Sequence, residues 1–194
     1  MSVLLALAAA SAPVAQAQED APEPAGLPLA MLGESPRSFG APDSVWGAAG
    51  LGYADDLSES VDSYLWATYS WFMVQDVELA LEGGLWNHDQ PGDDAASLSL
   101  STIVRWHFVN AGGWTVFADA GIGVLVSTDV VPEGGTGLNF LPRLGAGVTR
   151  DLGGRARLLA GVRWHHISNA RIHGDIRNPS RDAAMLYVGV IFPF

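Results

Sequence analysis

Along most of the chain beyond residue 44, apolar and polar residues alternate. In the stretch 95–109, the apolar side chains from Ala96 to Phe108 fall on even positions, whereas Arg105 and His107 fall on odd ones. Successive side chains of a β-strand point to opposite faces, so this period of two predicts a strand with one apolar and one polar side. The same pattern predicts eight strands, at 44–54, 61–73, 76–87, 95–109, 114–126, 137–150, 155–168 and 182–194.

The length of these stretches and the residues on their polar side favour a barrel within a membrane. Each stretch spans at least 11 residues, about twice the roughly 5–6 residues common in globular proteins. Glycine and serine gather on the polar side with Glu82, Arg105 and Asp119, as expected for the narrow lumen of a transmembrane barrel. We therefore predict an all-β fold over residues 44–194, an eight-stranded antiparallel transmembrane β-barrel with a side-chain-filled lumen. A soluble sandwich or lipocalin-like barrel is the alternative.

The connections between the expected strands alternate in length. They are short at 74–75, 110–112 and 151–154, and longer and mostly acidic at 55–60, 88–94, 127–136 and 169–181. Outer-membrane barrels have short periplasmic turns and longer extracellular loops. A terminal aromatic residue such as Phe194, on an alternating last strand, resembles the assembly signal of these proteins. The sequence thus predicts a barrel in the outer membrane of a Gram-negative bacterium, with the four longer connections outside the cell.

The residues before the barrel divide into an export signal and a linking segment. An apolar run ends on Ala15-Gln16-Ala17, the small-x-small form of a secretory cleavage site. This run is shorter than the roughly 20 apolar residues that a transmembrane helix needs, so we predict a signal peptide at 1–17. Residues 18–43 are rich in proline and lack periodicity, which predicts a flexible periplasmic N-terminal segment.

Composition removes several classes of protein. A hydrophobic share of 48% is too high for a disordered chain. The absence of cysteine excludes a disulfide scaffold and any thiolate metal site. Acidic residues number 21 against 10 basic ones, all of them arginine, and this balance argues against a nucleic-acid partner.

One stretch near the C-terminus carries candidate catalytic residues. His166 and Ser168 are two positions apart on an expected strand, so their side chains share the outward face, and Asp182 has the outward parity on the next strand. A serine hydroxyl becomes a nucleophile when an imidazole accepts its proton and a carboxylate orients the imidazole. Asn169 follows directly and has an N–H to donate to a developing oxyanion. A His-x-Ser pair also occurs by chance, so a purely structural role is the alternative.

A metal site is not expected from the histidines of this stretch. His165, His166 and His173 are close in sequence, but His165 and His166 point to opposite faces of a strand. No second carboxylate–histidine set is recognised in the sequence, so we predict no metal. Acyl transfer to serine requires no cofactor, and none is predicted.

The C-terminal third of the chain resembles the PagL-type lipid A 3-O-deacylases. The resemblance lies in the motif at 166–170, in Asn178-Pro179 and in the glycine-rich stretch 137–147. Members of this family are eight-stranded outer-membrane barrels that remove an ester-linked acyl chain from lipid A. The resemblance is specific over about 136–194 and only architectural before that.

The resemblance implies a role for each matching residue: Ser168 as nucleophile, His166 as general base, Asn169 as an oxyanion donor and Asn178 as a support of the site loop. Two positions depart from the family. Asp182 stands where a glutamate is usual, and because aspartate is one methylene shorter it must lie closer to His166. Arg171 stands where a glycine is usual, so any positive φ at this position costs more.

These observations lead to one functional hypothesis, an outer-membrane serine esterase that hydrolyses an ester-linked acyl chain, at the 3-O position by resemblance, of lipid A in lipopolysaccharide. Its active site would lie at the extracellular leaflet, with outer-membrane lipid around it, and a homodimer is compatible with the sequence. Acidic loops, such as Asp55-Asp56 and Asp93-Asp94, face an anionic substrate, so we expect divalent cations to bridge the two. The alternatives are a non-catalytic structural or adhesive barrel, and an acyltransferase.

Overall fold

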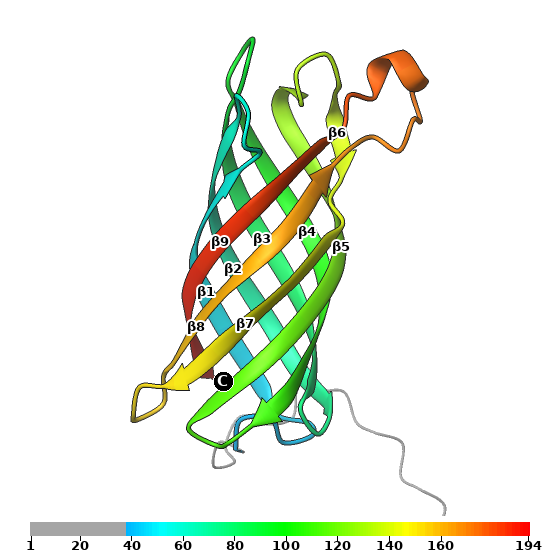
Figure 1. The fold of residues 1–194 in the computed structure, drawn as a ribbon. Helices are drawn as coiled ribbons and strands as arrows, with labels where there is room; N and C mark the ends of the chain where they lie inside the picture. The colour runs from blue at the N-terminus through cyan, green and yellow to red at the C-terminus, as the bar shows by residue number, and fades with distance from the viewer. Residues whose placement is uncertain (1–37) are drawn as a thin grey trace, which may run out of the picture. The chain divides into compact units, whose positions relative to one another are not determined.

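The structure, a computed structural model, describes residues 38–194. The expected signal peptide at 1–17 and most of the expected flexible segment lie outside these residues. The elements in chain order are β1 (Val45–Asp55), β2 (Val61–Val74), β3 (Val77–Asp89), β4 (Ala95–Asn110), β5 (Trp114–Val131), β6 (Thr136–Phe140), β7 (Arg143–Asp151), β8 (Arg157–Ile167), a short 3-10 helix η2 (Asp175–Arg177) and β9 (Arg181–Pro193) (Figure 1). Within residues 38–194 no helix is long and apolar enough to span a bilayer.

These strands form one closed antiparallel barrel. Neighbouring strands pair in the order β4-β3-β2-β1-β9-β8-β7-β5-β6, and pairing between β4 and β5 closes the sheet. Strands β6 and β7 both pair with β5, one with its second half and the other with its first. Together they occupy the position of one strand, the eighth of the barrel, and the prediction of an eight-stranded barrel is confirmed.

The pair β6 and β7 differs from the single continuous strand expected at 137–150. It is interrupted at Leu141 and Pro142, and proline has no backbone N–H to donate to a neighbouring strand. Hydrogen bonds still bridge the interruption, since Leu141 exchanges two bonds with Gly123 and the His166 amide donates to the Pro142 carbonyl over 3.0 Å. The break lies level with the end of β8, beside the candidate catalytic residues.

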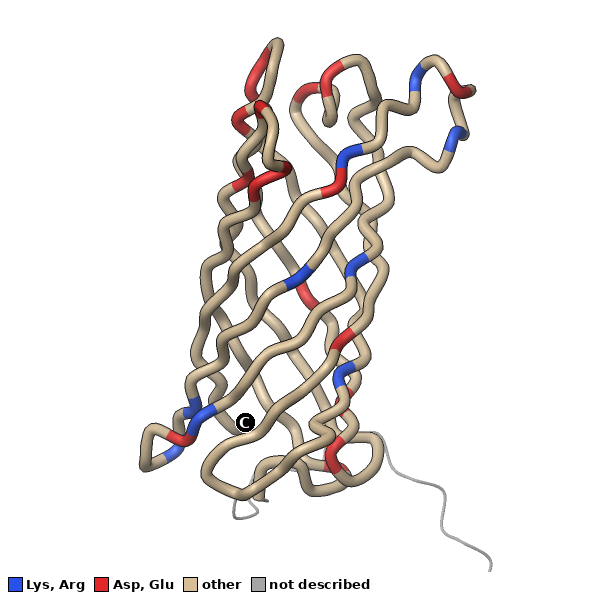
Figure 2. The backbone as a smooth tube through the Cα atoms, viewed as in Figure 1, with Lys and Arg blue, Asp and Glu red and all other residues tan. Residues whose placement is uncertain are grey.

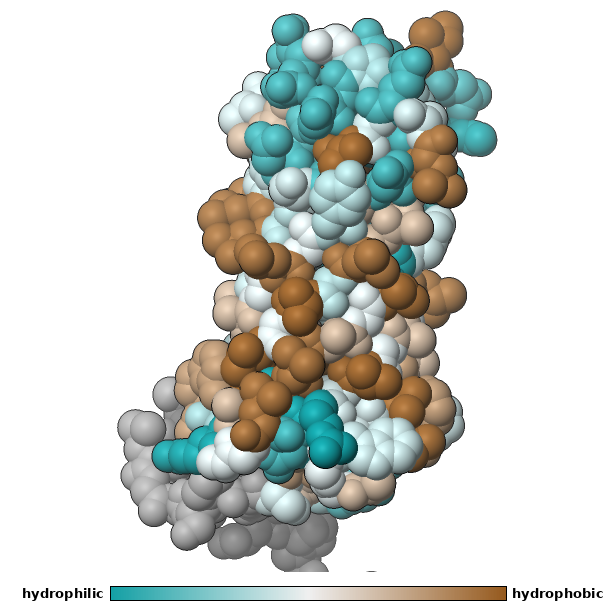
Figure 3. All heavy atoms as spheres, turned by 60° about the vertical axis from the view of Figure 1, so that its left-hand side comes forward, coloured by the Kyte–Doolittle hydropathy of each residue, from teal (hydrophilic) through white to brown (hydrophobic). Residues whose placement is uncertain are grey.

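The apolar side of each strand faces outward, as the prediction of a membrane barrel requires. Along β4, buried and exposed residues alternate over nearly its whole length, with Leu98 and Trp106 exposed and Ser97 and Arg105 buried. Figure 3 shows the resulting brown side chains over the middle of the barrel, with hydrophilic residues at the upper end. This arrangement excludes the soluble lipocalin-like alternative, whose apolar side would face inward.

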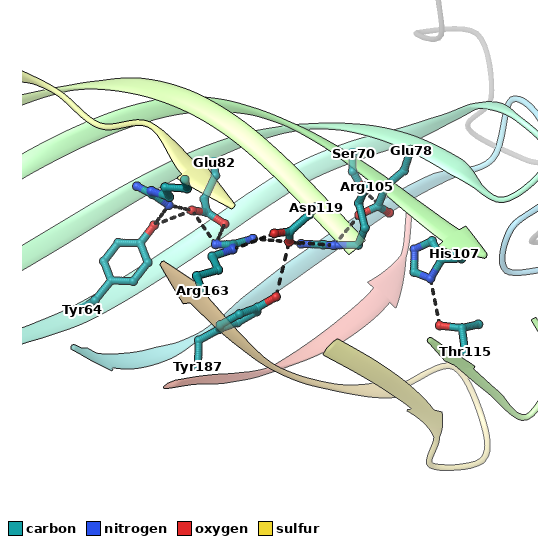
Figure 4. Close-up of polar contacts among 11 residues, drawn as sticks. Tyr64, Ser70, Glu78, Glu82, Arg105, His107, Thr115, Asp119, Arg163 and Tyr187 are labelled. Atoms are coloured by element: carbon teal, nitrogen blue, oxygen red, sulfur yellow. Dashed lines mark hydrogen bonds and ion pairs between the residues drawn. The ribbon is translucent and has the colours of Figure 1, made fainter. Parts of the chain in front are cut away.

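A network of ion pairs fills the middle of the lumen (Figure 4). Asp119 accepts from Arg163 over 2.8 Å and pairs with Arg105, and Glu82 pairs with both Arg163 and Arg143. These side chains are almost fully buried. A buried charge without a partner is strongly destabilising, so the alternation of acids and arginines is what permits so many charges inside. The lumen is packed with side chains, as predicted.

The two ends of the barrel differ in their connections. One end, the short-turn end, carries the turns 75–76, 111–113 and 152–156, and the other, the long-loop end, carries the connections 56–60, 90–94, 132–135 and 168–180. Figure 1 shows the short-turn end at the bottom and the long-loop end at the top. The candidate catalytic residues all belong to the long-loop end.

Residues 38–43 close the short-turn end. Although proline content predicts flexibility up to residue 43, the ring of Phe39 packs edge-on against Trp46, Phe72 and His107, each at 5.1 Å between centroids. The Asp76 amide also donates to the Gly40 carbonyl over 2.9 Å. These contacts attach residues 38–43 to the short-turn end, where the Phe39 ring buries apolar surface.

Candidate active site

The candidate site is built where β8 ends and β9 begins. In the register of these two strands His166 lies directly opposite Asp182, and both side chains point to the outer surface. His166 Nδ1 and Asp182 Oδ1 are 2.9 Å apart. The aspartate side chain is 57% exposed and the histidine side chain 23% exposed, so the pair can be reached from outside the barrel.

Trp164 is the third member of this outward cluster. Its indole Nε1 donates to Asp182 Oδ1 over 2.9 Å, and its ring stacks on that of His166 with 5.8 Å between centroids. The indole and the imidazole, stacked on each other, therefore contact the same oxygen of the carboxylate. A signal was present in the sequence, because Trp164 precedes His166 by two residues on the same face of the strand.

Ser168 is held by its backbone, and the residue is only 9% exposed. Its carbonyl accepts from the Phe140 amide over 2.8 Å, and its own amide donates to the Phe140 carbonyl over 3.3 Å. In the described part of the chain its hydroxyl makes no hydrogen bond, and none joins it to His166. The structure thus brings His166 and Asp182 together, and it leaves Ser168 beside them without the serine–histidine contact.

Asn169 braces the loop that follows Ser168. Its side-chain amide donates to the Thr136 hydroxyl over 3.1 Å and to the Arg177 carbonyl over 2.5 Å, so both of its N–H groups are in use. Its backbone amide donates to Asn178 Oδ1 over 2.9 Å, which closes the loop at its base. Ala170, in contrast, is an exposed residue, and its amide has no acceptor within residues 38–194.

The turn after Asn169 has an unusual backbone. Ala170 and Arg171 have φ angles of 51° and 62°, in the left-handed region that favours glycine. The Arg171 amide donates to Asn169 Oδ1 over 2.9 Å, which helps to hold this conformation. Arg171 stands where the family usually has glycine, and its positive φ is therefore a strained conformation, as expected from the sequence.

A second Ser–His–Asp set lies inside the lumen at the same end, and sequence reasoning did not single it out. His88 Nε2 is 2.8 Å from Ser97 Oγ, and His88 Nδ1 is 2.6 Å from Asp62 Oδ1. Arg181 also pairs with Asp62. Ser97, the most exposed of the three, is only 6% exposed. Across residues 38–194 no group of three or more His, Cys, Asp or Glu residues has the arrangement of a metal site.

Comparison with protein families decides the relationship of the chain. The model of the PagL family, described as lipid A 3-O-deacylase, matches residues 57–190, which is more than half of the chain. The chain belongs to the PagL family. This family places it among the lipid A deacylases and confirms the resemblance seen in the sequence.

Solved structures show the same fold as this PagL-family chain. The outer-membrane enzyme PagL has a TM-score of 0.55 and 22% identity, over 77% of this chain and 99% of its own. Neisserial surface protein A has a TM-score of 0.54 and 17% identity, over 77% and 96%. The N-terminal barrel domain of OprF from Pseudomonas aeruginosa has a TM-score of 0.51 and 21% identity, over 78% and 98%. These structures share the barrel fold with this chain. Comparison with curated proteins gives no significant match.

Proposed function

We propose that this PagL-family barrel is a serine esterase that hydrolyses the ester-linked acyl chain at the 3-O position of lipid A. The observation that carries the proposal is the His166–Asp182 contact of 2.9 Å on the outer surface, next to a serine whose hydroxyl is unengaged. Membership of a lipid A deacylase family supplies the substrate class.

The position of the site supports catalysis in the outer leaflet. If the long-loop end faces the outside of the cell, as in other outer-membrane barrels, the His166–Asp182 pair lies at the outer edge of the lipid-facing surface. Apolar side chains, among them Val162 and Leu186, are exposed on the same strands below it. The acyl chains of lipid A would run along these residues and place the ester carbonyl at the level of Ser168.

In the first step, Ser168 Oγ attacks the ester carbonyl and His166 takes the hydroxyl proton. Because His166 Nδ1 is engaged with Asp182, its other nitrogen, Nε2, is the one available as base. Asp182 orients the ring and stabilises the imidazolium that forms. The contact between Ser168 and His166 forms when substrate binds, since catalytic hydrogen bonds are often long before that.

The negative charge on the former carbonyl oxygen needs a donor close to Ser168. The amide of Ala170, which has no acceptor within residues 38–194, fits this role, because it can donate to the oxyanion without first breaking another hydrogen bond. Asn169 can serve as the expected oxyanion donor only if one N–H leaves Thr136 or Arg177. In the ground state Asn169 and Asn178 instead hold the turn that presents Ala170.

The remaining steps regenerate the enzyme. Collapse of the tetrahedral intermediate breaks the bond to the sugar oxygen, and the His166 imidazolium gives its proton to that oxygen. Water then attacks the acyl-serine with His166 again as base, which releases a free fatty acid and restores the Ser168 hydroxyl.

The test is fatty-acid release by the purified barrel from lipid A, followed by mass spectrometry of both products. Hydrolysis predicts loss of one ester-linked chain from the 3-O position and an equal amount of free fatty acid. If the wild type and Ser168→Ala release equal amounts, the esterase proposal fails. The open Ser168–His166 contact favours a second candidate, a non-catalytic barrel, which predicts no release from either protein. An acyltransferase would instead add mass to lipid A when a phospholipid is present.

A further inference from the structure

The connection between β8 and β9 differs from the other connections at the long-loop end. Residues 170–177 are exposed without interruption, and they include two arginines and two isoleucines. In Figure 1 this connection leans outward from the barrel wall. The residues of the connections 56–60, 90–94 and 132–135 include acids but no base, and Figure 2 shows the same contrast.

The connection between β8 and β9 is a turn held by its own backbone hydrogen bonds. The Gly174 amide donates to the Arg171 carbonyl over 2.9 Å, the Asn178 amide donates to the Asp175 carbonyl over 3.3 Å, and η2 lies between these bonds. The base of the turn is fastened by Asn169. A turn of fixed shape holds its side chains in set directions, so little ordering remains to be done when a ligand binds.

Two isoleucines project from this turn into solvent. Ile176 is 97% exposed and Ile172 is 65% exposed. Exposed apolar side chains gain free energy when they enter apolar surroundings, and single ones elsewhere on a surface need no explanation. These two are held by one folded turn that begins two residues after Ser168, next to a lipid-facing wall.

The charges of the turn complement an anionic ligand. Arg171 pairs with Asp175 at 3.2 Å, with both side chains largely exposed, and Arg177 has no ionic partner within residues 38–194. Two arginines and one aspartate leave this turn positive. The neighbouring connection 56–60 stays negative: partial burial raises the pKa of Asp56, but hydrogen bonds from Ser58 and Ser60 outweigh this and hold that pKa below its ordinary value.

We propose that residues 170–177 form a substrate-engaging loop for lipid A. Ile172 and Ile176 enter the outer leaflet beside the barrel wall, and Arg171 and Arg177 bind the phosphates of the glucosamine headgroup. The identity of the ligand rests on the proposed function. A headgroup held in this way has its acyl esters next to Ser168, because the loop and the serine are joined by the turn at Asn169.

Site-directed labelling tests the insertion without any need for turnover. The chain has no cysteine, so Ile176→Cys in the full-length barrel takes a single environment-sensitive bimane label. Leu57→Cys is the matched control, since Leu57 is 87% exposed on an acidic connection at the same end. In phosphatidylcholine vesicles containing lipid A, we expect the label at 176 to be protected from aqueous iodide and the label at 57 to be quenched. Equal quenching at both positions would overturn the proposal.

Kinetics tests the headgroup contact. In Arg171→Gln/Arg177→Gln, we expect the KM for lipid A to rise roughly tenfold and to lose most of its dependence on ionic strength. Arg150→Gln/Arg155→Gln makes the same charge change on exposed residues of the short-turn end and should leave KM unchanged. An equal rise of KM in both variants, or in neither, contradicts the proposed loop. If the wild type releases no fatty acid, the proposed function fails, whereas the labelling result still decides whether the loop enters the leaflet.

Discussion

The two Ser–His–Asp sets of this barrel differ in what each possesses. The set in the lumen has both hydrogen bonds of a catalytic triad, with 2.8 Å from Ser97 to His88 and 2.6 Å from His88 to Asp62. The set on the outer surface has the histidine–aspartate bond only, between His166 and Asp182. If hydrogen bonding alone identified the catalytic set, the set in the lumen would be chosen.

Access of a lipid substrate to each set favours the outer surface instead. The lumen set is closed in by paired strands and by neighbouring buried side chains, so an acyl ester in the membrane has no path to it. There the serine and histidine mainly satisfy each other and Asp62, as buried polar groups must. In the outer set Asp182 and His166 are open on the outer surface of the barrel, where the proposed ester would lie, although Ser168 itself is only 9% exposed. A catalytic triad is therefore identified by its position relative to the substrate as well as by its internal distances.

The two serines should differ most in their effect on activity. Ser168→Ala should lower the rate of fatty-acid release by about a thousandfold or more, because the nucleophile is lost. Ser97→Ala should leave the rate close to that of the wild type. A fluorophosphonate ester should label Ser168, as mapped by mass spectrometry of the digested barrel. Labelling of Ser97 instead would transfer the active site to the lumen.

The two aspartates should separate stability from activity. Asp62→Asn leaves Arg181 buried beside a neutral amide, so we expect the free energy of unfolding to fall by about 3–5 kcal/mol. Asp182→Asn should leave unfolding unchanged, because the carboxylate is exposed, while kcat falls by roughly a hundredfold or more. Urea unfolding in vesicles and lipid A turnover measure the two quantities. A stability loss in Asp182→Asn would show that this residue serves the fold.

Trp164 should have a smaller effect, as a positioning residue that acts through Asp182. Trp164→Phe keeps a ring to stack on His166 and removes the donor to the carboxylate, so we expect kcat to fall about fivefold with a shifted pH–rate profile. Trp106→Phe is the control, because Trp106 is also an exposed tryptophan but lies near the short-turn end. Equal losses in the two variants would point to a general role of the aromatic surface.

The smallest effect should come from restoring the acid that is usual in the family. In Asp182→Glu the longer side chain still reaches across the strand pair to His166, so kcat should rise or stay within about twofold of the wild type. Turnover of lipid A is again the measurement. A large loss would identify a different residue as the acid partner of His166.

Much of the fold could be predicted from the chain because side-chain direction in a strand is a local property. Period-two alternation was enough to assign outward faces to Leu98 and Trp106 and inward faces to Arg105 and Asp119. The interruption at Pro142 and the ordering of Phe39 were not predicted. Pairing across the interruption is kept by bonds between Leu141 and Gly123, and the packing of Phe39 depends on Trp46, Phe72 and His107, so both involve residues distant in sequence.

The candidate site, too, could be predicted from the sequence only in part. Parity placed His166, Ser168 and Asp182 on the outer face, but parity says nothing about which residues of adjacent strands are opposite each other. That depends on register, which pairing of the whole sheet sets, and register is what puts Asp182 against His166 and Asp62 against His88. Alternation along the chain thus accounts for which side chains face lipid. Pairing of β8 with β9 brings an imidazole, a carboxylate and an indole together there, because the register of the pair, which the order of the strands in the sequence does not specify, sets their offset.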